Sequence, residues 1–176
     1  MVDKEGIKVK QILTHEDISA GTRDDPKDRR GLAGCLLVIK AAGAAAEKGY
    51  SLEECYTVAE RMERNMATLA VAVSSATHPA TGDIISEVPD KRMVIGMGQH
   101  GEGGKMGPQD LKSAHETAEQ MVSMLLDDLN VSSGEELLVM LNGVGSTTLM
   151  ELYIVLQDVK KILDAKGIKL VRSLAG

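Results

Sequence analysis

The sequence predicts an α/β (α+β) fold, a mixed β-sheet packed by helices, and three observations support this prediction. Apolar runs with strand character alternate along the chain with segments whose apolar residues recur at helical spacing. Serine or threonine followed three residues later by glutamate marks helix starts. Glycine-rich turns follow two of the apolar runs. The 176 residues suffice for one domain with a sizeable core, which we expect over residues 1–176.

The composition argues against nucleic-acid binding. Hydrophobic residues make up 43% and charged residues 26% of the chain, as in ordinary soluble proteins, but Phe and Trp are absent and only three Tyr occur. The core must therefore consist of aliphatic residues and methionine. A net charge of −6 and the lack of rings for base stacking both disfavour a nucleic-acid partner.

Cysteine usage and hydropathy predict a soluble, cytoplasmic protein. Cys35 and Cys55 form no C-x-x-C pair and have no histidine nearby at metal-ligand spacing. We therefore predict two reduced, buried thiols, and no disulfide or metal site. No apolar run is long enough to span a membrane, and residues 1–5 do not resemble a signal peptide.

The first third of the chain predicts a strand, a loop and a helix. Residues 7–13 alternate apolar and polar side chains, as strands do. Residues 14–30 are polar and turn-rich, which predicts a loop with a solvated, charged surface. Residues 31–48 are rich in alanine and aliphatic residues, which favours a helix that ends at Gly49.

A capping box of Ser51 and Glu54 predicts the next helix. Its apolar stripe is typical of a core face and consists of Leu52, Cys55, Ala59, Met62 and Met66. Residues 69–73 fit either an extension of this helix or a strand. Residues 74–90 predict a long connection to the first glycine loop.

Residues 93–104 read M-V-I-G-M-G-Q-H-G-E-G-G and form the first candidate functional site. The apolar start predicts a buried strand, and the glycines that follow let a small molecule approach the backbone. His100 and Glu102 stand in this loop. An imidazole there can act as base, acid, ligand or nucleophile, although a lone histidine in a glycine loop is also typical of a solvent-facing turn.

The last third predicts two helices and two strands. A helix is expected to start at residues 108–110, with its buried stripe formed by Leu111, Ala114, Ala118, Met121 and Leu125. The apolar run 137–141 suits a strand covered on both faces and leads into a second glycine turn at 142–147. Thr148 and Glu151 then cap a helix that runs to Gly167, and a strand follows at 168–171. Neither glycine turn matches a strict phosphate-binding motif, so we predict no nucleotide site.

Four stretches in order resemble the substrate-binding K subunit of dihydroxyacetone (glycerone) kinases. They are R-R-G-L-A-G with K-A-A-G-A-A-A-E-K-G, the S-L-E-E box, G-M-G-Q-H-G-E at 96–102, and L-N-G-V-G-S-T-T-L-M-E-L-Y at 141–153. The resemblance covers nearly the whole chain and implies the fold of the second half of that subunit. It departs at Gly103 and Thr148, where the family usually has proline.

The resemblance implies a role for His100. In the family, the histidine of this motif binds the carbonyl carbon of dihydroxyacetone covalently as a hemiaminal, so His100 is the expected catalytic anchor. Gly98, Gln99, Gly101 and Glu102 are the expected substrate-binding residues. The bound ketose would then receive a phosphoryl group on its terminal hydroxyl, a step that depends on positioning and charge stabilisation. The alternatives are a non-catalytic coactivator or sensor of the same family, or another protein that binds short keto-sugars.

The resemblance also implies partners. The family's subunit has an additional α/β half before the region matched here, which carries an acid and a base for the reaction. We therefore expect a companion half, no cofactor or metal on this chain, and ATP or ADP with Mg on a separate L subunit. We also expect a homo- or hetero-oligomer, since the family forms dimers, and no phosphorylation by this chain alone.

Overall fold

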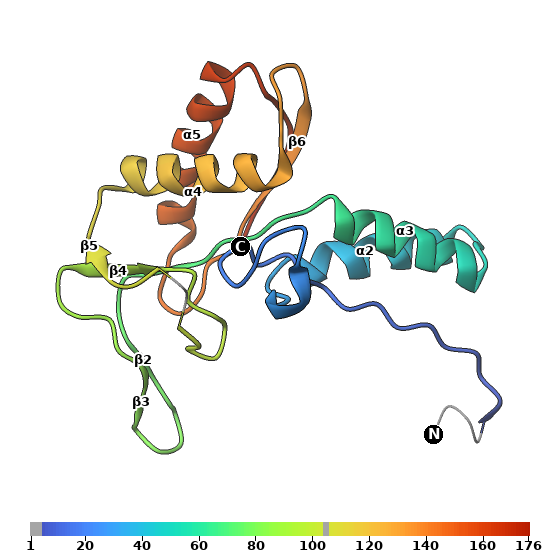
Figure 1. Cartoon of the computed structure of the whole chain (residues 1–176), viewed down its shortest axis with the longest axis horizontal. Helices are drawn as coiled ribbons and strands as arrows, with labels where there is room; N and C mark the ends of the chain where they lie inside the picture. Colours follow the sequence, from blue (N-terminus) through green and yellow to red (C-terminus); the bar gives the residue numbers. More distant parts are fainter. Residues whose placement is uncertain (1–4, 104–105) are drawn as a thin grey trace. The chain divides into compact units, whose positions relative to one another are not determined.

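We describe a computed structural model of the chain over residues 5–103 and 106–176. It is a mixed α/β structure, as predicted, in which helices pack beside small sheets (Figure 1). The described elements are η1 (Pro26–Asp28), α2 (Cys35–Glu47), α3 (Leu52–Arg64), β1 (Val71–Ala72), β2 (Ala76–Thr77), β3 (Ile84–Ser86), β4 (Arg92–Ile95), β5 (Gln109–Asp110), α4 (Ala114–Leu129), β6 (Glu136–Leu141), α5 (Leu149–Ala165) and β7 (Lys169–Ala175).

The chain divides into two compact units. Of the described residues, the first unit comprises 5–70 and 96–103, and the second comprises 71–95 and 106–176. A single domain over residues 1–176 stays a prediction. Residues 1–4 of the N-terminal segment and Gly104 of the predicted glycine loop lie outside the described residues.

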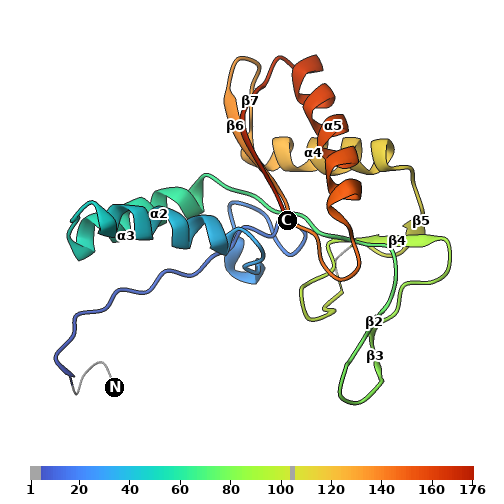
Figure 2. The same cartoon turned by 180° about the vertical axis from the view of Figure 1, so that it is seen from behind.

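The first unit is built on α2 and α3, which lie side by side in both views (Figures 1 and 2). Its small core confirms the predicted methionine stripe in part. The buried members are Val38, Ala59 and Met66, and Ile12, Ala42 and Met62 pack against them. Both hydrogen bonds of the Ser51–Glu54 capping box form, and Gly49 follows α2 with a φ of +80°. The predicted glycine end and helix start are thus confirmed.

The predicted helix over 31–48 starts four residues late, at Cys35. A neighbouring segment of the chain fills the space where side chains of Gly31 and Gly34 would otherwise lie. A Cβ on Gly34 would lie 2.8 Å from Glu16 Cγ, and one on Gly31 would overlap the Thr14 hydroxyl. These two glycines therefore let the chain before α2 pass close to residues 14–16.

The predicted strand at 7–13 is wrong. The segment is extended, but no strand in the described part of the chain pairs with it, and a strand requires such a partner. Its apolar side chains are exposed, by 60% for Ile7, 55% for Val9 and 73% for Leu13.

The loop at 14–30 is confirmed, and its predicted solvated surface is confirmed only in part, since Asp24, Asp25, Lys27 and Asp28 are exposed. Glu16, Asp17, Ser19 and Arg29 are all buried. Asp17 forms an isolated parallel bridge with Thr68, and backbone hydrogen bonds on both sides of it attach the loop to the segment after α3. Charged residues are buried here because the fold supplies them with partners.

The second unit contains three small sheets. β1, β4 and β5 pair antiparallel in that order, β2 and β3 form a hairpin within the connection predicted at 74–90, and β6 pairs in parallel with β7. Residues 69–73, left open by the sequence, therefore contain a strand, β1. Helices α4 and α5 cross beside β6 and β7 (Figures 1 and 2). Their shared core consists of Ala118, Val122, Leu126, Val159, Ile162, Leu163 and Ile168.

Three predictions in the second unit need correction. The helix expected from 108–110 begins at Ala114, because Gln109–Asp110 pairs with β4 and Ser113 caps the helix. Its buried stripe is therefore shifted, to Ala118, Val122 and Leu126. Strand β6 is not covered on both faces, since its Leu138 is 40% exposed.

Other predictions for this unit are confirmed. Thr148 and Glu151 form both bonds of the capping box of α5, Gly167 follows that helix with a φ of +71°, and β7 begins at Lys169. In the first unit, the prediction of two buried thiols is wrong: Cys35 is exposed and Cys55 is intermediate, and both are unpaired. In the described residues, no helix is both long enough and apolar enough to cross a membrane.

Candidate functional site

The candidate site is a tight glycine turn that follows strand β4. The strand ends at Ile95, and Gly96 turns the chain with a φ of +84°. The Gly98 N–H donates to the Glu102 carbonyl at 2.7 Å, and the Gly101 N–H donates to the Gly98 carbonyl at 3.1 Å. Gly101 has a φ of +86°, which residues with a side chain rarely adopt. The turn therefore closes on itself and presents residues 99 and 100 at its tip.

His100 is held by Glu102 through two contacts. One carboxylate oxygen accepts the backbone N–H of His100 at 2.9 Å, and the other lies 3.0 Å from Nδ1 of the ring. An ionised carboxylate only accepts hydrogen bonds, so a neutral imidazole must carry its proton on Nδ1. The second nitrogen, Nε2, is then left with a free lone pair. The side chain of His100 is 84% exposed, so the ring faces outward from the turn.

Glu102 is held in its ionised form. Its own backbone N–H lowers the pKa of the carboxyl below the ordinary value; desolvation opposes this shift, and hydrogen bonds from the ring and backbone of His100 add to it. A lowered pKa keeps the negative charge at neutral pH. The charge remains available both to fix the ring and to balance a positive charge on it.

Arg30 anchors the turn by binding two of its backbone carbonyls. Its Nη2 donates to the Gly96 carbonyl at 2.8 Å and its Nη1 to the Glu102 carbonyl at 3.3 Å. The guanidinium is in turn held by Asp17, which accepts from Nε at 2.8 Å and lies 2.6 Å from Nη2. Ser19 joins the cluster, since its hydroxyl accepts from Nη2 at 3.0 Å and lies 2.7 Å from the other Asp17 oxygen.

Sequence reasoning missed this cluster of Asp17, Ser19 and Arg30. A signal for it is present: Arg30 lies in the R-R-G-L-A-G stretch, and D-x-S is a spacing at which aspartate commonly bonds the backbone two residues on. The Ser19 N–H does donate to Asp17, at 3.0 Å. The polarity of the loop, taken alone, predicts that these charged side chains face solvent, and the D-x-S spacing was therefore overlooked.

Gly98 lies where Arg30 and Glu102 approach each other. A Cβ on this glycine would overlap both Nη1 of Arg30 and a carboxylate oxygen of Glu102. Glycine is therefore required here for space, because the backbone angles at this residue are ordinary. Arg30, which binds the ends of the turn, and Glu102, which fixes the histidine, therefore lie on either side of this glycine.

The structure brings together four of the five predicted site residues. His100, Glu102, Gly98 and Gly101 share the hydrogen bonds of the turn, and Gln99 lies exposed at its tip. His115 is exposed on α4, and its ring lies 3.5 Å from Asp158. Among the described residues, no three His, Cys, Asp or Glu side chains lie together as metal ligands.

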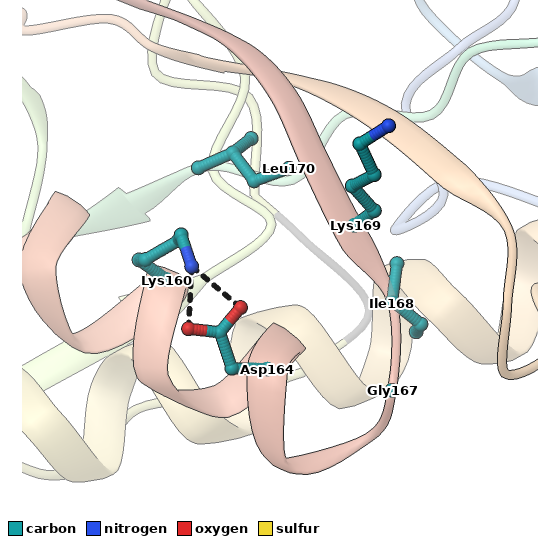
Figure 3. Close-up of a pocket in the computed structure, with 6 residues that line it drawn as sticks. All are labelled: Lys160, Asp164, Gly167, Ile168, Lys169 and Leu170. Atoms are coloured by element: carbon teal, nitrogen blue, oxygen red, sulfur yellow. Dashed lines mark hydrogen bonds and ion pairs between the residues drawn. The ribbon is translucent and has the colours of Figure 1, made fainter.

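Two surface hollows are lined by residues outside this turn. The first, of about 260 Å³, is in the second unit where α5 meets β7 (Figure 3). Three of its lining residues are charged: Lys160 and Asp164 bind each other, one helical turn apart, and Lys169 pairs with Glu136. The second, of about 490 Å³, lies along α2 and α3 and is lined mainly by aliphatic side chains and Arg61. Neither lining contains a histidine, a cysteine or a hydroxyl side chain, so the glycine turn is the better candidate.

Comparison with known proteins agrees with these features. The family model described as the Dak1 domain matches residues 1–176. The dihydroxyacetone-binding subunit DhaK of "PTS-dependent dihydroxyacetone kinase 2" from Listeria innocua is 36% identical over 176 residues, which is 100% of this chain and 52% of that subunit. The L-erythrulose kinase of Pectobacterium atrosepticum is 36% identical over 179 residues, covering 99% of this chain and 30% of the kinase.

A solved structure gives the same result for the fold. The dihydroxyacetone kinase operon co-activator DhaQ superposes with a TM-score of 0.88 at 29% identity, over 99% of this chain and 54% of that protein. The chain therefore spans about half the length of both the dihydroxyacetone-binding subunit and the co-activator.

Proposed function

The chain belongs to the Dak1 domain family, and on this premise we propose that it holds a short ketose, dihydroxyacetone or a close relative, for phosphoryl transfer. His100 captures the ketose as a covalent hemiaminal. The single observation that carries the proposal is the pairing of Nδ1 of His100 with the Glu102 carboxylate, which leaves Nε2 as a nucleophile. A ketone is the electrophile that suits such a nitrogen.

The capture step balances without a cofactor. The Nε2 lone pair attacks the carbonyl carbon, a C–N bond forms, and the π electrons of the carbonyl move to its oxygen, which takes a proton from solvent. The ring gains a positive charge and keeps its proton on Nδ1, and the Glu102 carboxylate stabilises that charge at 3.0 Å. Glycerol has no carbonyl group and cannot react, so capture distinguishes carbonyl sugars from polyols by reactivity.

The exposure of the ring supports a role for groups outside this chain. An 84% exposed imidazole can hold a ketose but has no wall against water. We propose that a companion half supplies this wall together with the acid and base, and that a separate L subunit brings ATP or ADP with Mg. Assembly into a homo- or hetero-oligomer and a cytoplasmic location belong to the same proposal.

The choice of ketose follows from the same chemistry. A hemiaminal requires only a carbonyl carbon, so dihydroxyacetone, glyceraldehyde and erythrulose can all react. The names of two relatives, a dihydroxyacetone-binding subunit and an erythrulose kinase, fit this range. Competition between these sugars for His100 would rank them.

Capture is tested by carbon NMR with dihydroxyacetone labelled with ¹³C at its carbonyl carbon. With the wild-type chain, we expect a protein-bound signal in the region of sp³ carbons bearing oxygen and nitrogen. The His100→Ala variant should lose this signal completely. An unchanged signal in the alanine variant would remove His100 from the mechanism, and no signal in the wild type at any ketose concentration would overturn capture by this chain.

Glu102→Gln tests the carboxylate. The amide is neutral and cannot balance the charge on the ring, so we expect ketose affinity to fall roughly threefold to tenfold, a modest loss because Glu102 is half-exposed. Glu119→Gln removes one charge from the exposed face of α4 and serves as the control. Equal affinities in the two variants would show that Glu102 does not act on the ring.

The alternative is a co-activator or sensor that binds the ketose without phosphorylating it. The superposition on the co-activator DhaQ favours this second candidate specifically. The two functions differ in the fate of the ketose after capture. Adding the companion half, an L subunit and a phosphoryl donor should convert the ketose to its phosphate if the chain belongs to a kinase, and should leave the ketose unchanged if it is a sensor.

A further inference from the structure

We propose that Asp17 and Arg30 are positioning residues, which hold both ends of the glycine turn so that His100 and Glu102 stay in register for capture. The inference rests on the proposed function, because the position of the ring matters for capture only if His100 binds the ketose. Neither residue touches the reacting atoms. Both act through the backbone that carries them.

Arg30 fixes the turn at its two ends. The carbonyls that it binds belong to Gly96, where the turn begins, and to Glu102, where it closes. The Glu102 carbonyl also accepts the Gly98 N–H, so the guanidinium completes a bond that already spans the turn. A guanidinium can serve two carbonyls at once through its planar fork, whereas the single ammonium of lysine cannot present this arrangement.

Asp17 fixes Arg30. The Asp17 side chain has no exposed surface, and the Arg30 side chain is 23% exposed. One carboxylate oxygen binds Nε and Nη2 of Arg30, and the other binds the N–H and hydroxyl of Ser19. Both carboxylate oxygens are therefore occupied, and the guanidinium is held against Asp17 in one orientation. A buried ion pair of this kind is weak evidence for stability but supports a fixed geometry.

The backbone ties Asp17 to Arg30 as well. The Asp17 N–H donates to the Arg30 carbonyl at 3.0 Å, and the neighbouring Ile18 N–H donates to Thr68 at 3.1 Å. The aspartate is therefore held at its main chain and its side chain. Contacts therefore connect this buried segment, through the Arg30 guanidinium, to the turn that carries the histidine.

Arg30→Lys tests the inference, because it keeps the positive charge and removes the fork. We expect the Gly98 and Gly101 amides to exchange with solvent about tenfold to hundredfold faster, from the loss of charge-assisted bonds. The nitrogen shifts of the His100 ring should move towards a mixture of tautomers, and ketose affinity should fall by a similar factor. Arg64→Lys, at an exposed arginine on α3 that pairs with Glu60, is the control and should change none of these.

Two further variants keep the test decisive. Asp17→Asn should reproduce the effects of Arg30→Lys, and Ser19→Ala should give a smaller loosening of the same amides. If Asp17→Asn fails to fold, Arg30→Lys and Ser19→Ala carry the test.

The inference is overturned if Arg30→Lys folds and leaves amide exchange and ring shifts as in the wild type. A loosened turn in the variant, with no ketose bound by the wild type, would support the positioning role and remove ketose capture.

Discussion

The two glycine turns of this chain look alike in sequence and differ in how they are held. Each follows a strand, β4 for residues 96–103 and β6 for residues 142–147. The first is anchored by the partly buried Arg30 and the buried Asp17, and it carries His100 with its carboxylate partner. The second carries no titratable side chain. Its Gly143 N–H and its Asn142 side-chain amide donate to the Gly176 carbonyl, and the same amide donates to the Gly143 carbonyl.

The difference shows what makes a glycine turn a chemical site. Glycine gives the backbone freedom in both places, with a φ of +86° at Gly101 and +69° at Gly145. Only the first turn combines that freedom with fixed charges, because Arg30 binds the carbonyls at both of its ends. The carboxylate of the second region, Glu151, is used by the cap of α5. The first turn is therefore a candidate for chemistry, and the second is a helix entry.

Moving the histidine to the other turn should have the largest effect. Val144 is 73% exposed in the second turn, and Val144→His in the His100→Ala background places an imidazole there with no carboxylate fixed beside it. We expect no covalent ketose signal by carbon NMR, as for His100→Ala alone. Capture by the introduced imidazole would show that any exposed histidine suffices and that the anchored carboxylate is irrelevant.

The space around Gly98 gives the next largest effect. Gly98→Ala would force Arg30 and Glu102 apart, which should lower the free energy of unfolding by about 1–3 kcal/mol and weaken ketose binding. Gly103→Ala in the same turn is the matched control, since a Cβ there has no neighbour within 4 Å. Urea unfolding and ketose titration of both variants measure the contrast. Equal results would mean that Gly98 is not confined.

The elements that the sequence predicted well are those specified locally. The capping boxes at Ser51 and Thr148 depend on residues three positions apart, and both form as expected. The strand before the first glycine turn and the positive φ of Gly49 and Gly167 likewise follow from neighbouring residues. Such features need no knowledge of the remaining chain.

The elements that the sequence failed to predict depend on distant partners. Residues 7–13 have strand periodicity, but no described strand pairs with them. Asp17 is buried because Arg30 and Thr68 bind it, whereas its polarity alone predicted exposure to solvent. In the candidate site, the residues at the tip of the turn could be named from the motif. The anchor beneath them could not, because it arises from tertiary contacts.

The smallest effect belongs to the second region and should be confined to stability. Thr148→Ala removes the cap of α5 and should lower the free energy of unfolding by about 1 kcal/mol, with ketose capture unchanged.

Hydrogen bonds from the Thr148 backbone and hydroxyl lower the pKa of Glu151 from its ordinary value of 4.5. Ionised Glu151 therefore stabilises the fold above about pH 4.5, and this contribution is lost as the pH falls through the lowered, folded-state pKa. Urea unfolding of wild type and variant at neutral and strongly acidic pH should show the difference shrinking in acid. A difference of unchanged size in acid would show that ionised Glu151 takes no part in the cap. A loss of ketose capture would contradict the separation of the two turns.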